Sequence, residues 1–227
     1  MKVLLFCDEH YHPGQIAIDG VKPLTAKDYE FHIIRNGAAF NPELLQDYSV
    51  IIMAKCDEIS PEDKTSWKTL EVQQAFIDFI ANGGGMIVIH NGLVAGKNTT
   101  KLDRVIGSRF KWHPHDCPVT TEPIKAHPIT KNIEQFCEID EHYYLDILVD
   151  DINILMASYS PPQGDVAKYE EDPYHNAPAK IEPSCYTRNY KKGRICVLTP
   201  GHHLKVWHNP NFQLLLDNSI RWCSGNS

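Results

Sequence analysis

Short runs of apolar residues recur along the chain and are separated by segments with a helical spacing of apolar positions. Four of these runs, at residues 2–7, 50–54, 86–89 and 195–198, are almost entirely apolar, and residues 29–34 form a weaker fifth run. Runs without polar alternation and rich in β-branched residues are typical of parallel strands that are covered on both faces. The pattern therefore predicts an α/β fold with a mostly parallel sheet.

Two helices are expected from apolar residues that repeat every three or four positions. The first covers residues 66–81, with Ser60-Pro61-Glu62 as its start signal and Asn82-Gly83-Gly84-Gly85 as its end. The second covers residues 212–222 and closes the chain. Residues 12–27 show no convincing helical period, so the first crossover is expected to be a loop.

The region from residue 110 to residue 190 has a different character. It is rich in proline and contains three strand-like pieces, at residues 119–124, 139–145 and 152–159. These pieces are expected to form antiparallel extensions wrapped over the sheet, and residues 160–178 are expected to be an exposed loop. No internal repeat or coiled-coil heptad occurs, and 227 residues suit a single α/β domain spanning residues 1–227.

The composition narrows the kind of partner. Twenty-nine acidic residues stand against 22 basic ones, whereas a nucleic-acid binder needs a basic surface. No apolar run approaches the ~20 residues of a membrane span, and the N-terminal run is too short for a signal peptide. The seven scattered cysteines, with no CxxC, indicate reduced thiols. A cytoplasmic protein with a small-molecule partner is expected, and a homo-oligomer is left open.

Polar, titratable residues follow four of the predicted strands. They are residues 7–12 (Cys-Asp-Glu-His-Tyr-His), 55–57 (Lys-Cys-Asp), 90–92 (His-Asn-Gly) and 201–203 (Gly-His-His). In open parallel sheets ligands bind beyond the carboxyl ends of the strands, so these residues are expected to share one edge. Twelve histidines are an excess for this length, and imidazoles serve as metal ligands and as proton carriers near neutral pH.

The segment from Gly83 to His90 combines a glycine run, a strand and a histidine. A phosphate-binding loop follows a strand and opens a helix, so glycines before a strand are interpreted as a helix stop. His90 occupies the strand-to-helix turn where α/β hydrolases carry a nucleophilic serine. It could ligate a metal, act as a base or hydrogen-bond the backbone of its loop. Cys7 and Cys56 also end strands but lie in no G-x-C-x-G elbow, and they are interpreted as small buried hydrophobic residues.

Several segments, in order along the chain, resemble those of the trehalose-utilisation, ThuA-like, proteins. They are Gly83–His90, Gly107–Pro114, His127–Thr130, Asp140–Tyr143, Gly193–Ile195, Pro200–His202 and Trp207–Phe212. The resemblance implies a flavodoxin-like, three-layer α/β/α sandwich similar to class I glutamine amidotransferases. Those enzymes carry a cysteine at the elbow that holds His90 here, so glutamine hydrolysis through such a thiol looks excluded.

The strand-end positions and the resemblance together define a set of candidate site residues. The expected catalytic residues are His90, Glu141, His202 and His113, and the expected substrate-binding residues are His12, Trp112, Tyr143 and Trp207. His90, His113 and His202 are also candidate ligands of a divalent metal such as zinc. The competing interpretation is that each histidine ties down its own loop and that the tryptophans belong to the core. His127 is expected to fix a turn.

Two functions are compatible with this set. The first is an enzyme of sugar or disaccharide metabolism, of the trehalose type that the resemblance implies, with a histidine-rich acid/base or metal-assisted site. The alternative is a non-catalytic module that holds a carbohydrate in the same pocket. The enzyme is favoured because a binder needs donors and aromatic rings but not several titratable groups at one edge.

Overall fold

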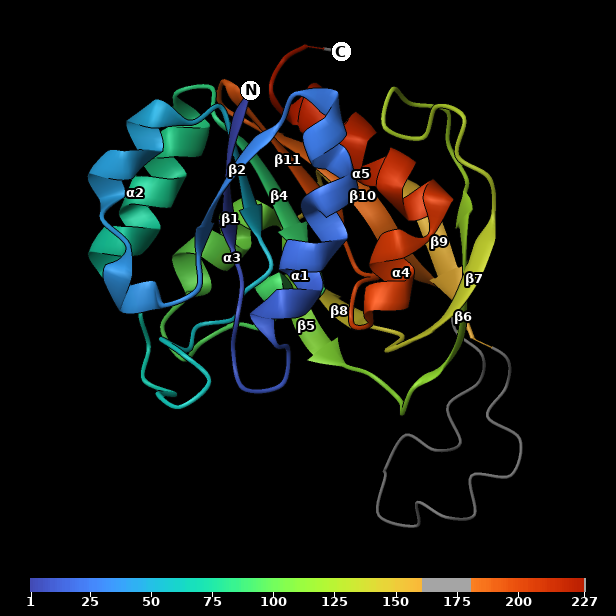
Figure 1. The fold of residues 1–227 in the computed structure, drawn as a ribbon, viewed down its shortest axis with the longest axis horizontal. Coiled ribbons are helices and arrows are strands. Elements are labelled where there is room, and N and C mark those ends of the chain that lie inside the picture. Colours follow the sequence, from blue (N-terminus) through green and yellow to red (C-terminus); the bar gives the residue numbers. More distant parts are fainter. Residues whose placement is uncertain (161–180, 227) are drawn as a thin grey trace.

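Nine strands form one twisted sheet in the order β2-β1-β3-β4-β11-β10-β9-β6-β7 (Figure 1). The structure is a computed structural model and describes residues 1–160 and 181–226. The parallel half consists of β2 (Glu30–Ile34), β1 (Lys2–Phe6), β3 (Val50–Met53), β4 (Gly85–Ile89) and β11 (Gly193–Leu198). All five strands were predicted from apolar runs, and their order is that of the flavodoxin-like fold.

The other half of the sheet is antiparallel. It consists of β10 (Glu182–Tyr190), β9 (Asn153–Tyr159), β6 (Cys117–Pro123) and β7 (Phe136–Asp140). A separate two-stranded sheet pairs β5 (Ser108–Trp112) with β8 (Tyr144–Ile147). The antiparallel pairing expected for the proline-rich region is therefore confirmed, but its strands β9, β6 and β7 extend the main sheet at one edge instead of wrapping over it. The expected loop at 160–178 lies, after Ser160, outside the described residues.

Helices cover both faces of the sheet. They are α1 (Gly14–Val21), α2 (Leu70–Ala81), α3 (Thr100–Ile106), α4 (Leu204–His208) and α5 (Pro210–Cys223), with short 3-10 helices at Lys22–Lys27, Gly37–Ala39, Pro42–Asp47 and His90–Leu93. Side chains of α1, α4 and α5 pack with one face of the parallel strands into one apolar core, and those of α2 and α3 pack with the other face into a second. This arrangement confirms the three-layer α/β/α sandwich.

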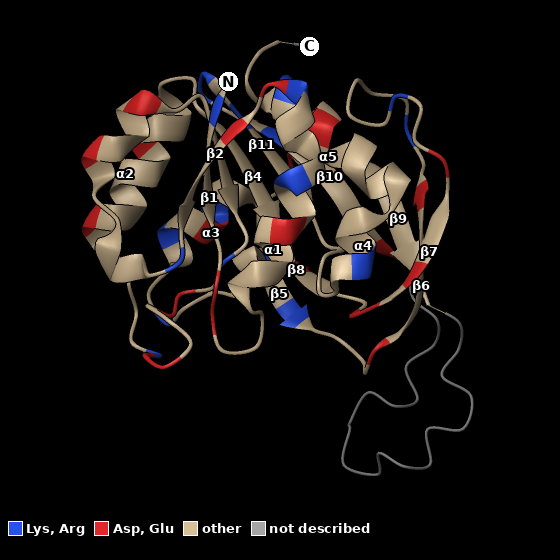
Figure 2. Ribbon diagram, in the orientation of Figure 1, with Lys and Arg blue, Asp and Glu red and all other residues tan. Residues whose placement is uncertain are grey.

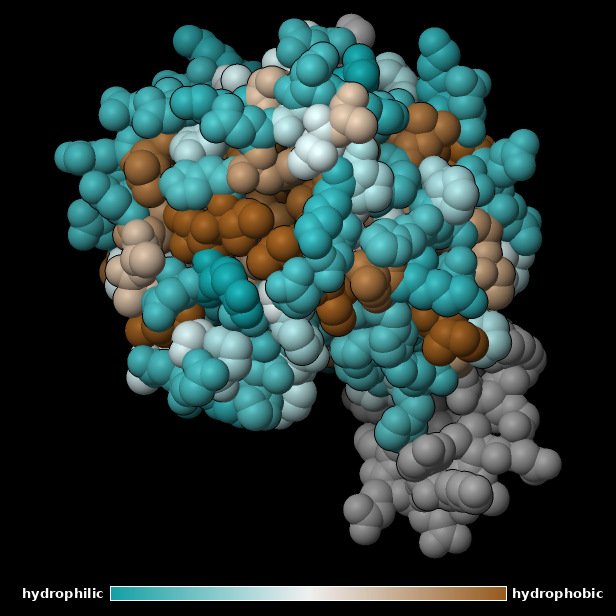
Figure 3. Space-filling view, in the orientation of Figure 1, coloured by the Kyte–Doolittle hydropathy of each residue, from teal (hydrophilic) through white to brown (hydrophobic). Residues whose placement is uncertain are grey.

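Alternating side chains of the strands explain the two cores. Val3 and Leu5 of β1 enter the first core, whereas Leu4 and Phe6 enter the second, and all four are fully buried. Because side chains alternate between the faces of a strand, a strand covered on both faces must be apolar at every position. At the edge strand β2 the covering is thinner, and hydrophobic side chains gather near the middle of the face drawn in Figure 3.

Two expectations about helices are corrected. The residues after β1 include the helix α1, although a loop was expected there. Helix α2 begins at Leu70 with Thr69 as its N-cap, whose side chain accepts a hydrogen bond from the Val72 amide. The Ser60 hydroxyl instead accepts the amide of Asp63 in a local turn, so the Ser-Pro-Glu signal marks a turn and not the helix start.

One expected strand is divided in two. Residues 139–145 were predicted as one piece, but β7 ends at Asp140 and β8 begins at Tyr144 in a different sheet. The three residues between them, Glu141 to Tyr143, form the connection. Among the described residues, no helix is both long and apolar enough to cross a membrane.

Candidate functional site

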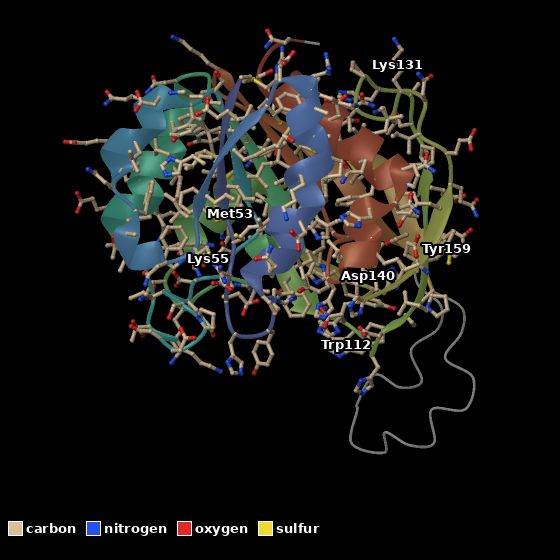
Figure 4. The ribbon with its side chains drawn as sticks, viewed as in Figure 1. Met53, Lys55, Trp112, Lys131, Asp140 and Tyr159 are labelled. Carbon is tan, nitrogen blue, oxygen red and sulfur yellow. The ribbon has the colours of Figure 1, made fainter. Side chains whose placement is uncertain are left out.

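Four side chains from distant parts of the chain meet beyond the carboxyl ends of the parallel strands. His12 follows β1, His90 follows β4, His202 follows β11, and Glu141 follows β7 of the antiparallel half. One ligand atom from each lies within 4.8 Å of those of the other three. Figure 4 labels Asp140, the neighbour of Glu141, near the lower edge of the molecule, where these strands end. We call these four residues the histidine–glutamate cluster.

The carboxylate of Glu141 lies at the centre of the cluster. Its Oε2 atom is 3.1 Å from His90 Nε2, 3.1 Å from His202 Nδ1 and 3.8 Å from His12 Nε2. The ring centroids of His90 and His202 are 5.5 Å apart. In the structure the strand-end histidines therefore converge on one point, as expected.

His113 lies at the outer side of the same carboxylate. Its Nε2 atom is 3.4 Å from Oε1 of Glu141, and its side chain is 32% exposed, compared with 1% for His90. Its Nδ1 lies 2.7 Å from the carbonyl oxygen of Pro114, which can only accept, so Nδ1 carries the hydrogen and Nε2 is left with its lone pair. His113 is therefore the member of the site that is open to solvent.

The backbone at the end of β4 aims His90 into the cluster. His90 has φ +47° and begins the 3-10 helix His90–Leu93, which gives it the sharp strand-to-turn geometry expected from the sequence. Its Nδ1 donates to the carbonyl of Thr199 at 2.7 Å. Its ring stacks on Tyr143, with centroids 3.9 Å apart. These two contacts fix the ring and leave Nε2 facing Glu141.

Buried carboxylates orient the other two histidines. Glu9, which is 2% exposed, contacts His12 Nδ1 through Oε1 and accepts the amide of Tyr11 through Oε2 at 2.8 Å. Asp140 is 1% exposed and accepts the amides of Gly201 and His202, each at 2.9 Å. Neither acid was among the predicted site residues, and both anchor the segments that carry the cluster.

Burial and charge set the protonation of the cluster. Burial lowers the pKa of His90 to about 4. For His12, burial alone would lower the pKa, but the carboxylates of Glu141 and Glu9 outweigh it and raise the pKa to about 9. Burial would raise the pKa of Glu141, but the imidazoles of His12, His202 and His90 hold it well below its usual range. A buried carboxylate thus faces three imidazole nitrogens, an arrangement that can move a proton or hold a cation.

The structure corrects the predicted role of Trp207. Its ring is 1% exposed, lies in the core under α1, and donates from Nε1 to the carbonyl of Gly201 at 2.8 Å. It has no free face for a sugar. Tyr143 is 2% exposed and its ring is stacked on His90, so it supports the cluster and is not a sugar platform. Trp112 is half-buried beside Tyr144, with ring centroids 4.9 Å apart, and its substrate-binding role stays a prediction.

Two other sequence interpretations concern groups outside the cluster. Burial raises the pKa of Cys7 and of Cys56 to about 12, so neither thiol is ionised near neutral pH. His127 accepts the amide of Ile129 through Nδ1 at 3.2 Å, which is the turn-fixing role expected of it. It lines a cavity of about 780 Å³ with Lys131, a residue that lies at the opposite end of the molecule from Asp140 (Figure 4).

The comparisons with known proteins identify the family of the chain and its fold. The model of the family described as trehalose utilisation, ThuA, matches residues 2–223. A ThuA-like protein from Bacteroides uniformis is 22% identical, with a TM-score of 0.69 over 98% of this chain and 91% of that one. One from Parabacteroides merdae is 17% identical, with a TM-score of 0.72 over 99% and 90%.

A structure named as a cytoplasmic protein from Salmonella typhimurium is 14% identical, with a TM-score of 0.64 over 98% of this chain and 99% of that one. No curated protein matches the chain in sequence. At these identities the solved structures show the shared fold alone.

Proposed function

The chain belongs to the ThuA family of trehalose utilisation, and from that premise we propose that it is an enzyme of sugar metabolism. Its substrate is a disaccharide or a sugar derivative, and its reaction takes place at the histidine–glutamate cluster. The observation that carries the proposal is the convergence of His12, His90, His202 and Glu141, with His113 beside them, beyond the sheet.

Titratable groups in this arrangement suit catalysis better than binding. A carbohydrate can be held by neutral donors and aromatic rings, whereas burying a carboxylate among imidazoles opposes folding unless the groups are paired. Clustered groups with pKa values pushed apart, as for His12 and His90, are typical of sites that transfer protons.

His113 is the residue we assign to proton transfer. It is the most exposed of the five, and its Nε2 lone pair is free because Nδ1 donates to Pro114. An imidazole in contact with Glu141 can accept a proton from a sugar hydroxyl and later return it. The buried cluster behind it supplies the electrostatic environment.

We further propose a cytoplasmic location and a small carbohydrate or carbohydrate derivative as the partner, with a homo-oligomer left open. The location draws support from the Salmonella typhimurium proteins, two of which are named as cytoplasmic. In the ribbon of Figure 2, positions with Lys or Arg are interspersed with positions with Asp or Glu among the described residues, which does not favour nucleic acid or an anionic membrane as a partner.

Turnover of a sugar panel tests the proposal. Purified protein is incubated with trehalose, other disaccharides and their oxidised and phosphorylated derivatives, and products are followed by NMR. We expect one class to be converted and His113→Gln to lower its kcat by about 10²–10⁴-fold. His208→Ala is the matched control, since that exposed histidine has one long contact, 3.4 Å to the carbonyl of Asp19.

The alternative function gives a different result in the same experiment. A non-catalytic module would show saturation transfer from the protein to a sugar that stays unchanged. Conversion that is equally fast in wild type and His113→Gln would contradict the assignment of His113. If the protein neither binds nor converts any sugar of the panel, that result would contradict the proposed function itself.

A further inference from the structure

We propose that the histidine–glutamate cluster is the ligand set of a single divalent transition-metal ion, bound by His12 Nε2, His90 Nε2, His202 Nδ1 and Glu141 Oε2. The inference deepens the proposed function and takes from it only that the cluster is the working site. It changes the expectation from the sequence, where His113 was a candidate ligand and His12 was not.

The spacing of the four atoms suits one ion. Nitrogen and oxygen ligands lie about 2.0–2.2 Å from such an ion, so neighbouring ligand atoms are separated by roughly 3.0–3.5 Å. The distances from Glu141 Oε2 are 3.1, 3.1 and 3.8 Å, and no two of the four atoms are more than 4.8 Å apart. One point between them is therefore within reach of all four with small adjustments of side chains.

The hydrogen bonds of His90 require a cation or a proton at that point. Its Nδ1 must carry the hydrogen, because the Thr199 carbonyl can only accept. Neutral His90 then presents a lone pair from Nε2 to a carboxylate oxygen 3.1 Å away. Two acceptors that face each other at this distance repel unless a positive charge lies between them.

Two further nitrogens of the cluster lie near Glu141 Oε2, at 3.1 and 3.8 Å, but form no well-aligned hydrogen bond with it. His12 Nε2 and His202 Nδ1 are buried and have no hydrogen bond to any atom of residues 1–160 and 181–226. Buried polar atoms nearly always form a hydrogen bond, and two of them without one in the same small space lower the stability of the fold. A shared metal ion would satisfy both nitrogens and the facing lone pair of His90 at once.

Two of the four proposed ligands, His12 and His90, also have the outer ring contact that metal ligands usually have. His12 contacts the Glu9 carboxylate through its other ring nitrogen, and His90 donates to a backbone carbonyl in the same way. His202 is held through its backbone amide by Asp140. Carboxylate and carbonyl partners of this kind fix the ring orientation of a ligating histidine and raise its basicity.

The donor set indicates which ions would bind. Three imidazoles and one carboxylate suit Zn²⁺, Ni²⁺, Co²⁺, Fe²⁺ or Mn²⁺, whereas Mg²⁺ and Ca²⁺ prefer oxygen ligands. Four protein ligands fill a tetrahedral ion, so an ion that also binds substrate would be five- or six-coordinate. It would polarise a sugar oxygen or a bound water as a Lewis acid. His113, which contacts the other oxygen of Glu141, would remain the base.

Metal binding to the full chain tests the proposal without an assay of turnover. Protein stripped with a chelator is titrated with Ni²⁺, Zn²⁺, Mn²⁺ and Mg²⁺ by calorimetry, and metal content is measured after gel filtration. We expect a single tight site, with Ni²⁺ and Zn²⁺ bound more tightly than Mn²⁺ and no binding of Mg²⁺. Glu141→Gln and His90→Gln should weaken this site by more than the ~10–100-fold typical of an outer partner.

His208→Ala serves as the control. It should bind the ion as wild type does, because His208 lies outside the site. Absence of stoichiometric binding to folded wild type would overturn the proposal, and so would Ni²⁺ or Zn²⁺ binding that Glu141→Gln and folded His90→Gln both leave unchanged.

The outcome is separable from that of the proposed function. If the protein binds the ion at these residues but converts no sugar, the proposed metal site stands and the proposed enzymatic function is contradicted. If the protein converts sugar but binds no ion at these residues, the proposed enzymatic function stands and the proposed metal site is contradicted.

Discussion

Glu9 is a buried carboxylate whose neighbours indicate that it positions His12. It contacts His12 through Oε1 and also accepts hydrogen bonds from the amide of Tyr11 and the side chain of Asn91. It thus connects the loops after β1 and β4. The sequence shows Glu9 three residues before His12, but only the turn between them brings the two side chains together.

Replacing Glu9 by Gln should therefore weaken the site without unfolding the protein. The amide keeps an acceptor but loses the negative charge that raises the basicity of His12, and loss of such an outer partner lowers metal affinity by about 10–100-fold. Calorimetric titration with Ni²⁺ measures the change. Glu58→Gln is the matched control, since Glu58 lies close to Glu9 but does not contact His12. Equal affinities for Glu9→Gln and wild type would refute the positioning role.

His142 is a buried histidine next to Glu141 that is not part of the cluster. It is 1% exposed and contacts the carbonyl and hydroxyl of Ser158 at 3.2 and 3.1 Å. Burial lowers its pKa from 6.5 to about 4. Between these two values the unfolded chain binds a proton at this position and the folded chain does not, so this contribution is fully present above pH 6.5 and is lost as the pH falls towards 4.

The pH dependence of stability should reveal this group. The lowered pKa of His142 corresponds to about 3 kcal/mol lost across that window. His142→Gln, which does not titrate, should show a smaller fall in the free energy of unfolding between neutral pH and pH ~4.5 than wild type. Urea unfolding at several pH values measures the difference. The raised pKa of Asp140 acts in the opposite direction, but it is present in both proteins. Parallel pH profiles would contradict the prediction.

At the level of elements, α1 shows how tertiary contacts can outweigh a weak local pattern. A loop was expected because residues 12–27 show no convincing helical period, and Gly14 and Gly20 also lower the helical propensity of this segment. Both positions lack space for a side chain: a Cβ atom on Gly20 would lie 2.6 Å from the ring of Trp207, and one on Gly14 would lie 2.6 Å from Asp8 Cβ. The helix forms because it packs closely against α4 and the end of β1.

Gly20→Ala therefore tests the packing of α1. In an exposed helix this change would stabilise the protein, but here the buried Trp207 cannot move aside, and overpacking should cost about 1–3 kcal/mol. Gln15→Ala on the exposed side of the same helix should stay within about 0.5 kcal/mol of wild type. Urea unfolding compares the two. A Gly20→Ala protein more stable than wild type would show that α1 does not pack on Trp207 as described.

The break between β7 and β8 places Glu141, and the sequence could not locate it. Ile139, Tyr143 and Leu145 lie at alternate positions with the polar Glu141 among them, and a single strand-like piece was expected. Strand β7 ends at Asp140, whose carboxylate accepts the Gly201 and His202 amides. That contact ties the antiparallel half of the sheet to the end of β11.

For the molecule as a whole, the site depends on both halves of the sheet. The parallel half supplies the three histidines, whose common edge is set by strand direction alone, so His90 and His202 could be predicted from the apolar runs that they terminate. The antiparallel half supplies Glu141, which was identified through a family resemblance and not through periodicity. Long-range contacts such as those of Glu9, Asp140 and Trp207 depend on the packed structure, which explains why sequence patterns did not assign them.

The measurement that tests the central claim most directly is anomalous diffraction from crystals of the protein grown with Ni²⁺ or Zn²⁺. Data collected above and below the absorption edge of the metal locate the ion independently of the protein coordinates. The account predicts one strong peak about 2.0–2.2 Å from His12 Nε2, His90 Nε2, His202 Nδ1 and Glu141 Oε2. No peak at the cluster, with Glu141 instead hydrogen-bonded directly to protonated histidines, would contradict it.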